Sequence, residues 1–490
     1  MSCFVAQRHP LTPSKSGSHI AMTTTIDPTQ ADPNAHNGEE NTMPSFGQRP
    51  GHRVFIETYG CQMNLADSEL MGGILGTSGY TAAPNHDEAD VILINTCAVR
   101  ERAEERVFGR LSHLLRYKHA RPEVILGVTG CMAERLREDI TERAPYVDLV
   151  VGPDAYRRLP KLIAESQEVE NDPVVDVKLD RDETYEGLSP KRTPGISGWV
   201  TVQRGCDKFC TFCIVPFVRG RERGVAPDEV LRQCRDLAER GYREVTLLGQ
   251  TVNSYRHEDT DFADLLELLV DVDGLERIRF TSPYPTDFTP KLIETMATHD
   301  EICNYLHLPL QSGSDDVLER MKRRYTSGEF LDLVGQIRET IPDIAMSTDI
   351  IVGFPGESDE DYQQTVDLLE EVRFDFAYLF KYSERDGTNA ARQLEDDVGE
   401  DVKGERLSSL IERQEEISGE VFKNRVGQTV QVMVIGESKR DAQDLCGRSD
   451  DFKMTVFPRP DDRELNPGDF VDVRVTDATS HTLLGEPVFR

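Results

Sequence analysis

The stretch QRGCDKFCTFCIVPFVRGR, residues 203–221, places three cysteines within eight positions. Cys206, Cys210 and Cys213 have the spacing C-x3-C-x2-C, in the most cationic part of a chain whose formal net charge is −32. A structural zinc site takes four ligands, and iron–sulfur clusters are normally held by four thiolates. The stretch therefore raises the question of which metal centre uses three.

No fourth ligand stands nearby. No histidine occurs between His119 and His257, and the next cysteine, Cys234, lies in an amphipathic helical pattern typical of a core position. Three thiolates would bind three irons of a [4Fe–4S] cluster and leave the fourth iron open. An open metal position is what allows a site to bind and transform a substrate. The spacing favours such a cluster, with zinc as the weaker alternative.

Six apolar strand candidates follow one another from this stretch onward, with amphipathic helical segments between them. They are GWVTVQRG (198–205), REVTLLGQ (243–250), RIRFTSP (277–283), NYLHLPLQ (304–311), AMSTDIIVGFP (345–355) and FDFAYLFKYS (374–383). Six units are too few for an eight-stranded barrel. We predict a partial (β/α)6 barrel, with the cysteine stretch at the carboxyl end of its first strand, where such folds keep their chemistry.

Three further cysteines share one position relative to three earlier strands. Each of three apolar stretches ends in a cysteine and is followed by a helical segment. RVFIETYGC ends in Cys61, DVILINTC in Cys97 and EVILGVTGC in Cys131. Apolar strands alternating with helices predict an α/β fold with a parallel sheet. Because the carboxyl ends of neighbouring parallel strands line one crevice, the three thiols could converge on one metal centre. The alternatives are three ordinary core residues, or a disulfide that leaves one thiol over.

Composition divides the chain into regions. We predict a disordered leader (1–50), an N-terminal open α/β domain (51–165), a linker (166–195), the partial barrel (196–420) and a small C-terminal β-barrel (421–490), the last from its period-two alternation. No apolar run approaches the ~18 residues that span a bilayer, and no signal peptide is recognisable. We expect a cytoplasmic protein, since thiols stay reduced there.

These motifs resemble those of a known protein family. C-x3-C-x2-C after the first strand of a (β/α)6 barrel resembles the radical S-adenosylmethionine (SAM) superfamily. Its methylthiotransferase family has motifs that resemble ETYGCQMNLADSE, INTCAVRERAEERVFGRL and GVTGCMAER of this chain. The residues of these motifs are most similar to those of the family members that act on isopentenyladenosine in tRNA. The resemblance covers roughly residues 53–487 and includes a C-terminal barrel of the TRAM type.

The resemblance implies an enzyme with two [4Fe–4S] clusters and SAM. Cys61, Cys97 and Cys131 would hold an auxiliary cluster that supplies sulfur. Cys206, Cys210 and Cys213 would hold the cluster that binds SAM and cleaves it to a radical. The product would be 2-methylthio-N6-isopentenyladenosine at position 37 of tRNA, made by adding a methylthio group to C2. No catalytic residue beyond the cluster ligands is implied.

Radical chemistry suits this substrate, because an aromatic C2–H is too weak an acid for a His or Asp base at neutral pH. Two alternatives keep the chemistry and change the substrate, to a ribosomal protein or to threonylcarbamoyladenosine in tRNA. An alternative of another class is a non-catalytic iron–sulfur redox or sensor protein, which would need no SAM pocket.

Contacts to SAM are expected from the ends of later barrel strands. The candidates are Gly249, Gln250, Gln311, Ser312, Gly313, Gly353 and Gly356. Gln311, Ser312 and Gly313 are expected to contact the ribose and carboxylate. The missing side chains of Gly353 and Gly356 would allow an adenine to stack closely.

Contacts to RNA are expected near the cysteine stretch. From residue 191 to 223 seven basic residues face two acidic ones, with aromatic residues between them, a combination that suits a single-stranded RNA loop. The candidates are Arg204, Lys208, Arg219, Arg221 and Arg223. A second basic cluster spans 321–325. The C-terminal barrel carries ten basic and twelve acidic residues, which is unusual for an RNA anchor. Expected partners are the tRNA anticodon loop and a reductant such as flavodoxin or ferredoxin, for a monomer without membrane contact.

Overall fold

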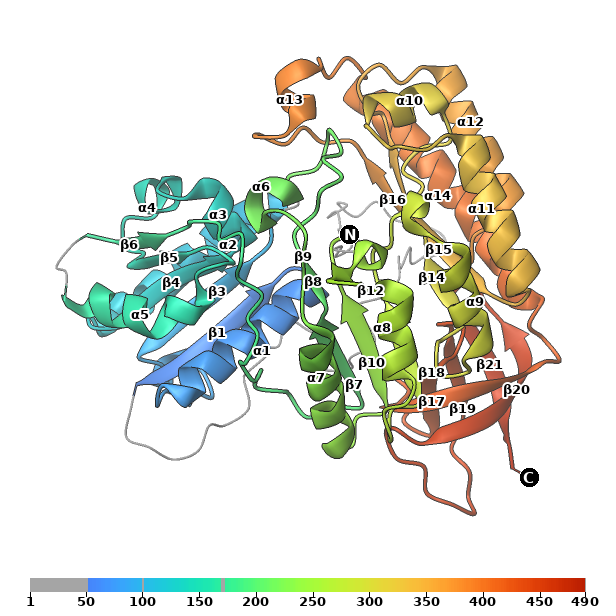
Figure 1. The fold of residues 1–490 in the computed structure, drawn as a ribbon, viewed down its shortest axis with the longest axis horizontal. Coiled ribbons are helices and arrows are strands. Elements are labelled where there is room, and N and C mark those ends of the chain that lie inside the picture. The colour runs from blue at the N-terminus through green and yellow to red at the C-terminus, as the bar shows by residue number, and fades with distance from the viewer. Residues whose placement is uncertain (1–51, 99–100, 169–171, 490) are drawn as a thin grey trace, which may run out of the picture.

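The computed structural model describes residues 52–98, 101–168 and 172–489. The predicted leader, residues 1–50, lies outside this range. Figure 1 shows an N-terminal α/β unit in blue and teal, a central α/β unit from green to orange, and a small β unit in red. This arrangement confirms the predicted fold class: a parallel α/β sheet, a partial barrel and a closed β-barrel.

The N-terminal unit is a six-stranded sheet in which every neighbouring pair is parallel, in the order β2-β1-β3-β4-β5-β6. The strands are β1 (Arg53–Tyr59), β2 (Thr81–Ala82), β3 (Val91–Thr96), β4 (Ile125–Gly130), β5 (Leu149–Val151) and β6 (Val174–Asp176). The helices are α1 (Gln62–Thr77), α2 (Glu101–Ala120), α3 (Cys131–Leu136), α4 (Asp139–Arg143) and α5 (Leu159–Glu168).

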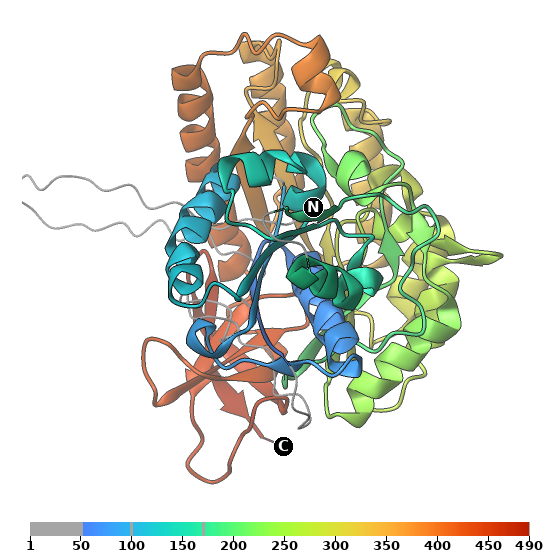
Figure 2. The same cartoon turned by 90° about the vertical axis from the view of Figure 1, so that its left-hand side faces the viewer.

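Side chains that alternate along β1 enter two separate cores. Phe55 packs with the face covered by α2, whereas Val54 and Ile56 pack with the face covered by α1 and α5. Figure 2 shows these helices on opposite sides of the sheet. Burial on both faces explains why β3 and β4 are apolar almost throughout.

This unit differs from the prediction in several details. Three strands were predicted, and the short strands β2 and β5 were not among them. β6 lies within the segment predicted as a linker and adds a parallel strand to the sheet edge, beside β5. The segment 133–143, predicted as one helix, is divided between α3 and α4 because Arg137 adopts a positive φ of 53°.

The central unit contains all six predicted barrel strands, in two parallel sheets of order β13-β10-β7 and β14-β15-β16. One parallel bridge between Ile278 and Ile302 continues the first sheet toward the second. The strands are β7 (Ser197–Thr201), β10 (Glu244–Leu248), β13 (Arg277–Phe280), β14 (Tyr305–His307), β15 (Ala345–Val352) and β16 (Phe376–Lys381). Short pairs are β8 (Gln203–Arg204) with β9 (Arg223–Gly224), and β11 (Arg256–His257) with β12 (Thr260–Asp261).

Helices of the central unit begin at recognisable signals. α7 has Pro227 in its first turn, and α11 begins with a capping box of Thr326 and Glu329. The helices are α6 (Val215–Arg219), α7 (Pro227–Glu239), α8 (Phe262–Leu269), α9 (Pro290–Thr298), α10 (Asp315–Arg320), α11 (Ser327–Thr340), α12 (Asp359–Val372), α13 (Asn389–Gln393) and α14 (Glu400–Lys423). α14 packs along β16 and leads into the C-terminal unit.

The C-terminal unit is a closed barrel in the order β17-β18-β19-β21-β20. Its strands are β17 (Thr429–Glu437), β18 (Asp444–Ser449), β19 (Met454–Pro458), β20 (Phe470–Ala478) and β21 (Thr482–Val488). It docks on the amino-terminal ends of the central strands. Arg277, which begins β13, donates to the carbonyls of Gln431 and Arg448, and Lys453 Nζ lies 2.5 Å from Asp375, just before β16. The barrel therefore lies at the opposite end of these strands from the cysteine stretch (Figure 1).

Within the described ranges, none of the helices combines the length and the apolar character needed to cross a membrane.

Candidate functional site

Cys61, Cys97 and Cys131, here called the N-terminal cysteine set, lie at one edge of the first sheet. Cys61 caps the amino end of α1, Cys97 directly follows β3, and Cys131 opens α3. β1, β3 and β4 are neighbours, and the register pairs Thr96 with Gly130, which brings Cys97 and Cys131 to the same level. Burial raises the pKa of the Cys131 thiol, and the nearby charge of Cys61 adds to this effect.

Two glycines permit this close approach. A Cβ on Gly60 would lie 2.9 Å from the Cβ of Cys97. Gly130 has φ +93°, and a Cβ there would lie 2.4 Å from the carbonyl oxygen of Thr96. Both positions therefore exclude a side chain, Gly60 by contact with a proposed ligand and Gly130 by contact with the neighbouring strand.

Gly130→Ala is expected to displace Cys131 and to remove iron bound by the N-terminal cysteine set. The added methyl group meets rigid backbone, so the cost should exceed the ~1–3 kcal/mol of an unfavourable φ alone. The measurement is iron content together with the unfolding midpoint. Gly79→Ala is the matched control, because Gly79 has φ +91° and nothing within 4 Å of its added Cβ. Equal iron in the two variants would contradict the prediction.

Two buried asparagines connect the loops that carry these cysteines. Asn64 Nδ2 donates to the carbonyl of Thr96 at 3.1 Å, and Asn95 Nδ2 donates to the carbonyl of Asn64 at 2.8 Å. The backbone N–H of Cys61 donates to Asn64 Oδ1 at 3.3 Å. Sequence reasoning missed both residues, although they lie within the motifs CQMN and INTC and could have been found as polar residues beside the proposed ligands.

Cys206, Cys210 and Cys213, here called the barrel cysteine set, lie in the loop between β8 and α6. Burial raises the pKa of Cys206 to about 11, the backbone N–H of Lys208 acts in the opposite direction, and the charge of Cys210 raises it further. Burial, then the charges of Cys210 and Cys206, raise the pKa of Cys213. The backbone N–H of Thr211 donates to the carbonyl of Met321 and holds the loop against the segment after α10.

Both cysteine sets suit iron–sulfur ligation. In the described part of the chain no three His, Cys, Asp or Glu side chains are arranged to hold a single metal ion. A cluster places each thiolate on a different iron, so its ligands are spaced more widely than those of one ion. The donors are thiols only, which is the soft donor set that such clusters prefer. Since burial raises the pKa of the Cys131, Cys206 and Cys213 thiols, a cationic centre would be needed to keep these three as thiolates.

The two cysteine sets meet at the boundary between the first two units. Cys131 packs with Ala98, Ile214 and Val218 in one buried apolar cluster, and Ile214 directly follows the barrel set. Cys61 packs beside Leu248, the last residue of β10, in another cluster. The sets therefore come from sheets of different domains but share one interface.

The structure contradicts the predicted RNA contacts of three arginines. Arg204 and Arg219 are each 3% exposed and lie 3.0 Å and 2.7 Å from the carboxylate of Asp67. Arg223 is also buried and lies 2.9 Å from Asp154. Their charges are balanced inside the protein by carboxylates of the N-terminal unit, so these side chains cannot form the predicted surface for phosphates.

Lys208 and Arg221 lie nearer the surface. Lys208 Nζ lies 2.5 Å from Asp287, and the exposed Arg221 pairs with Asp207. The Arg221 guanidinium also lies 5.6 Å from the centroid of the Phe209 ring. RNA contact by Lys208 and Arg221 stays a prediction.

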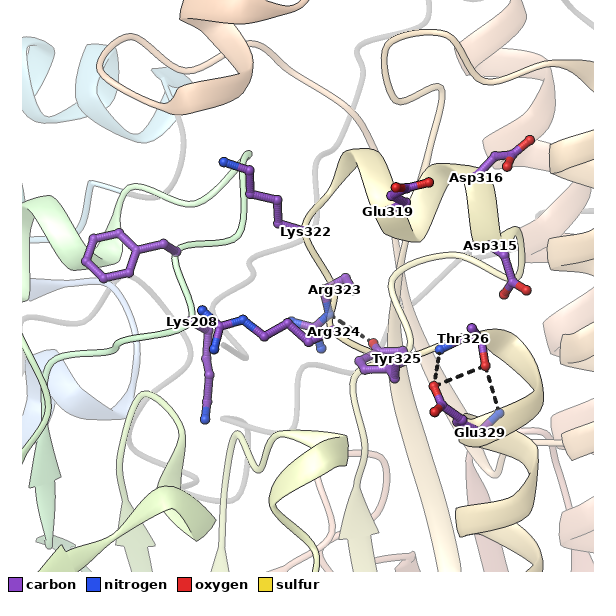
Figure 3. Close-up of a pocket in the computed structure, with 11 residues that line it drawn as sticks. Lys208, Asp315, Asp316, Glu319, Lys322, Arg323, Arg324, Tyr325, Thr326 and Glu329 are labelled. Carbon is purple, nitrogen blue, oxygen red and sulfur yellow. Dashed lines mark hydrogen bonds between the residues drawn. The ribbon is translucent and has the colours of Figure 1, made fainter.

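A cavity of about 660 Å³ opens beside the barrel cysteine set, a volume in the usual range for small-molecule sites. Lys208 and Phe209 line it from the cysteine loop, and residues 322–326 line it from the segment between α10 and α11. Figure 3 shows basic side chains toward the cysteine loop and acidic ones on α10 and α11. Arg323 is buried at this cavity and donates to Cys210 Sγ at 3.5 Å.

The predicted SAM contacts have different surroundings. Gln250 Oε1 accepts the backbone N–H of Gly205 at 2.5 Å, which joins the end of β10 to the cysteine loop. Gly249 precedes it, and a Cβ there would lie 2.9 Å from Val252 Cα. Gln311 adopts φ +75° and bridges to β15. For these three residues SAM contact stays a prediction.

The other four predicted SAM contacts lie against neighbouring helices. Ser312 Oγ lies 3.3 Å from Thr365 Oγ1, and a Cβ on Gly313 would lie 2.5 Å from a carbonyl of α12. A Cβ on Gly353 would lie 2.3 Å from Lys403 Cγ. The space beside Gly353 is thus filled by a lysine of α14, and the reason given for adenine stacking there is wrong. Beside Gly356 the nearest group is the Arg320 guanidinium, at 3.5 Å.

Three family models match separate parts of the chain. Residues 53–152 match the model described as uncharacterized protein family UPF0004, residues 200–369 match the radical SAM superfamily, and residues 423–488 match the TRAM domain. Among solved structures, the fold resembles the radical S-adenosylmethionine methyltransferase TsrM from Kitasatospora setae, with TM-score 0.53 and 14% identity over 70% of this chain and 77% of that one.

Curated relatives are far more similar to this chain in sequence than that solved structure is. A protein of Porphyromonas gingivalis strain W83 is 46% identical over 89% of this chain and 95% of its own length. One of Parabacteroides distasonis is 44% identical over 93% and 99%, and one of Chloroherpeton thalassium is 45% identical over 88% and 95%. All three carry the name tRNA-2-methylthio-N(6)-dimethylallyladenosine synthase. With this identity over nearly the whole of both chains, the protein belongs to the family of tRNA-2-methylthio-N(6)-dimethylallyladenosine synthases, within the radical SAM superfamily.

Proposed function

We propose that this protein is a methylthiotransferase that adds a methylthio group to C2 of N6-isopentenyladenosine at position 37 of tRNA. The observation that carries the proposal is that the N-terminal cysteine set packs against the segment that directly follows the barrel cysteine set. Each set can hold a [4Fe–4S] cluster through three thiolates and leave one iron open. A redox or sensor protein would need neither an open iron nor a SAM pocket, and the names of the relatives favour isopentenyladenosine over the other two substrates considered.

When bound, the cluster on the barrel set with SAM would supply the radical that removes the C2 hydrogen, the cluster on the N-terminal set would supply the sulfur, and another SAM would supply the methyl group. The chain's own residues position these groups. Asn64 and Asn95 connect the loops of the N-terminal set, Gln250 holds the cysteine loop at Gly205, and Thr211 ties the same loop to the segment after α10.

The C2 hydrogen of adenine would not be removed as a proton. The C2–H bond of adenine is not acidic enough for a side-chain base at neutral pH. A cofactor radical avoids this limit, and the protein contributes binding and orientation. A one-electron donor such as flavodoxin or ferredoxin would supply the electron. We propose a monomer that works in the cytoplasm, where the cysteines stay reduced.

The proposal is tested by nucleoside mass spectrometry of tRNA from cells that lack the gene. The methylthio nucleoside should disappear, N6-isopentenyladenosine should accumulate, and the unaltered gene should restore the product. Persistence of the methylthio nucleoside at its normal level would refute the substrate assignment.

Since Arg204, Arg219 and Arg223 are buried, the second basic cluster expected at 321–325 becomes the stronger candidate for RNA contact. Lys322 and Arg324 are exposed at the cavity beside the cysteine loop, and neither pairs with a carboxylate within the described residues. Unpaired basic side chains can neutralise phosphates without first losing an ion pair. We propose that these two residues, with Lys208 and Arg221, contact the anticodon loop.

Replacing Lys322 and Arg324 together by alanine is expected to weaken binding of an anticodon stem-loop. It should also make the binding constant less dependent on salt concentration. Each lost phosphate contact on single-stranded RNA reduces the slope of log K against log salt by about 0.7, so the pair should reduce it by about 1.4. Fluorescence anisotropy at several salt concentrations measures the slope. Arg143→Ala with Lys161→Ala removes two exposed charges of the N-terminal unit and serves as control. An unchanged slope in the Lys322/Arg324 variant would exclude these contacts.

A further inference from the structure

Arg219 connects the two cysteine sets. It is the last residue of α6, which begins directly after the loop of the barrel set, and its Nε donates to Cys131 Sγ at 3.0 Å. A single short segment thus leaves one set of proposed ligands and contacts a ligand of the other. Arg219 was expected to bind RNA, but its 3% exposure leaves it available only to groups inside the protein.

The charge of Arg219 is only partly balanced. Asp67 on α1 lies 2.7 Å from Arg219 Nη1, and the same carboxylate accepts a hydrogen bond from Arg204 Nη2 at 3.0 Å. Two guanidinium groups therefore share one carboxylate, and all three side chains are buried. An arginine stays protonated at any pH that a protein meets, so positive charge remains beside Cys131.

One nitrogen of Arg219 also lacks an acceptor. Nη1 lies beside the Asp67 carboxylate, but within the described residues the buried Nη2 has no hydrogen-bond partner. A buried N–H group without an acceptor costs free energy and is rare in native proteins. The arrangement points to an acceptor that the polypeptide does not supply, and the sulfur atoms of a cluster on Cys131 would be such acceptors.

We propose that Arg219 is a positioning residue that sets the reduction potential of the auxiliary cluster. Hydrogen bonds to ligand sulfurs and nearby positive charge stabilise the reduced, more negative state of an iron–sulfur cluster. Inside a protein this effect is strong because the effective dielectric constant is low. Arg219 therefore raises the potential of the N-terminal centre. The inference rests on the proposed function in one respect, namely that the N-terminal cysteine set holds a cluster.

The test uses the full chain with Cys206, Cys210 and Cys213 replaced by alanine, so that only the N-terminal cluster is observed. Its reduction potential is measured by EPR-monitored titration, without reference to activity. In this background Arg219→Met should lower the ratio of reduced to oxidised cluster at a fixed potential at least tenfold, a shift of about 59 mV for a one-electron couple. Arg219→Gln, which keeps a donor but loses the charge, should shift the potential in the same direction.

Arg192→Met is the matched control. Arg192 is also buried, also pairs with a carboxylate of α1, Glu69 at 2.9 Å, and donates to the Trp199 carbonyl at 2.7 Å. Replacing Arg192 should change the ratio of reduced to oxidised cluster less than threefold. Full iron with an unchanged potential in both Arg219 variants would overturn the proposal. Loss of iron from both, with Arg192→Met fully loaded, would overturn it as well, since Arg219 would then retain the cluster and not tune it. Absence of iron from the parent variant counts against the proposed function instead.

Discussion

Replacing Cys61, Cys97 and Cys131 together by alanine should abolish the methylthio product while SAM is still cleaved to 5′-deoxyadenosine. The barrel cysteine set remains intact in this variant, so the radical is still generated, but no sulfur source remains. Iron per chain should fall from about eight to about four, since one of two four-iron clusters is lost. Anaerobic iron and sulfide analysis, with chromatography of both products, measures all three quantities.

The reciprocal variant, with alanine at Cys206, Cys210 and Cys213, should also hold about four irons but should yield neither product. Cys234→Ala with Cys303→Ala is the matched control, because both thiols are buried in the central unit and belong to neither set. That control should keep about eight irons and full activity. Product formation by a chain without the N-terminal cysteine set would refute the division into two clusters.

Asp67→Ala should destabilise the protein by about 3–5 kcal/mol, because it leaves two buried guanidinium groups without their carboxylate. Asp67 is fully buried and is the carboxylate partner of both Arg204 and Arg219. Since these arginines belong to the central unit and Asp67 to the N-terminal unit, the loss should also loosen the interface that brings the cysteine sets together. Urea unfolding of the cluster-free chain, compared by the midpoint of the first transition, measures the effect.

Asp207→Ala is the control for this prediction. Its partner Arg221 is 62% exposed, and an exposed ion pair contributes only about 0–1 kcal/mol. Asp67→Asn should have an intermediate midpoint, because it keeps the shape and an acceptor but not the charge. If Asp67→Ala and Asp207→Ala unfold at the same urea concentration, the buried carboxylate does not hold the interface.

Local patterns were sufficient for the elements that carry the candidate site. The apolar runs before Cys61, Cys97 and Cys131 are strands, and all six strands expected in the central unit are present. Several of these segments, such as β3, β4, β10 and β13, are buried along their whole length, so their apolar composition reports their structure directly. The strand at Val174–Asp176 was missed because a three-residue edge strand has too few residues to show a pattern.

Contacts between distant residues explain the errors at the site. Arg219 is 88 residues from Cys131, and Arg204 is 137 residues from Asp67. In the sequence these arginines are indistinguishable from Arg221, which is exposed. Gly353 likewise resembled a ligand-facing turn, whereas Lys403 of a later helix fills the space beside it.

The amino-acid sequence by itself determined the order of the three units and the position of each cysteine at the end of a strand, because hydrophobic periodicity and strand ends are local properties. Only the tertiary structure decided which arginines face solvent and which lie beside a cysteine. Burial and pairing of a charge depend on the carboxylates that a distant segment brings near, and no local pattern contains that information.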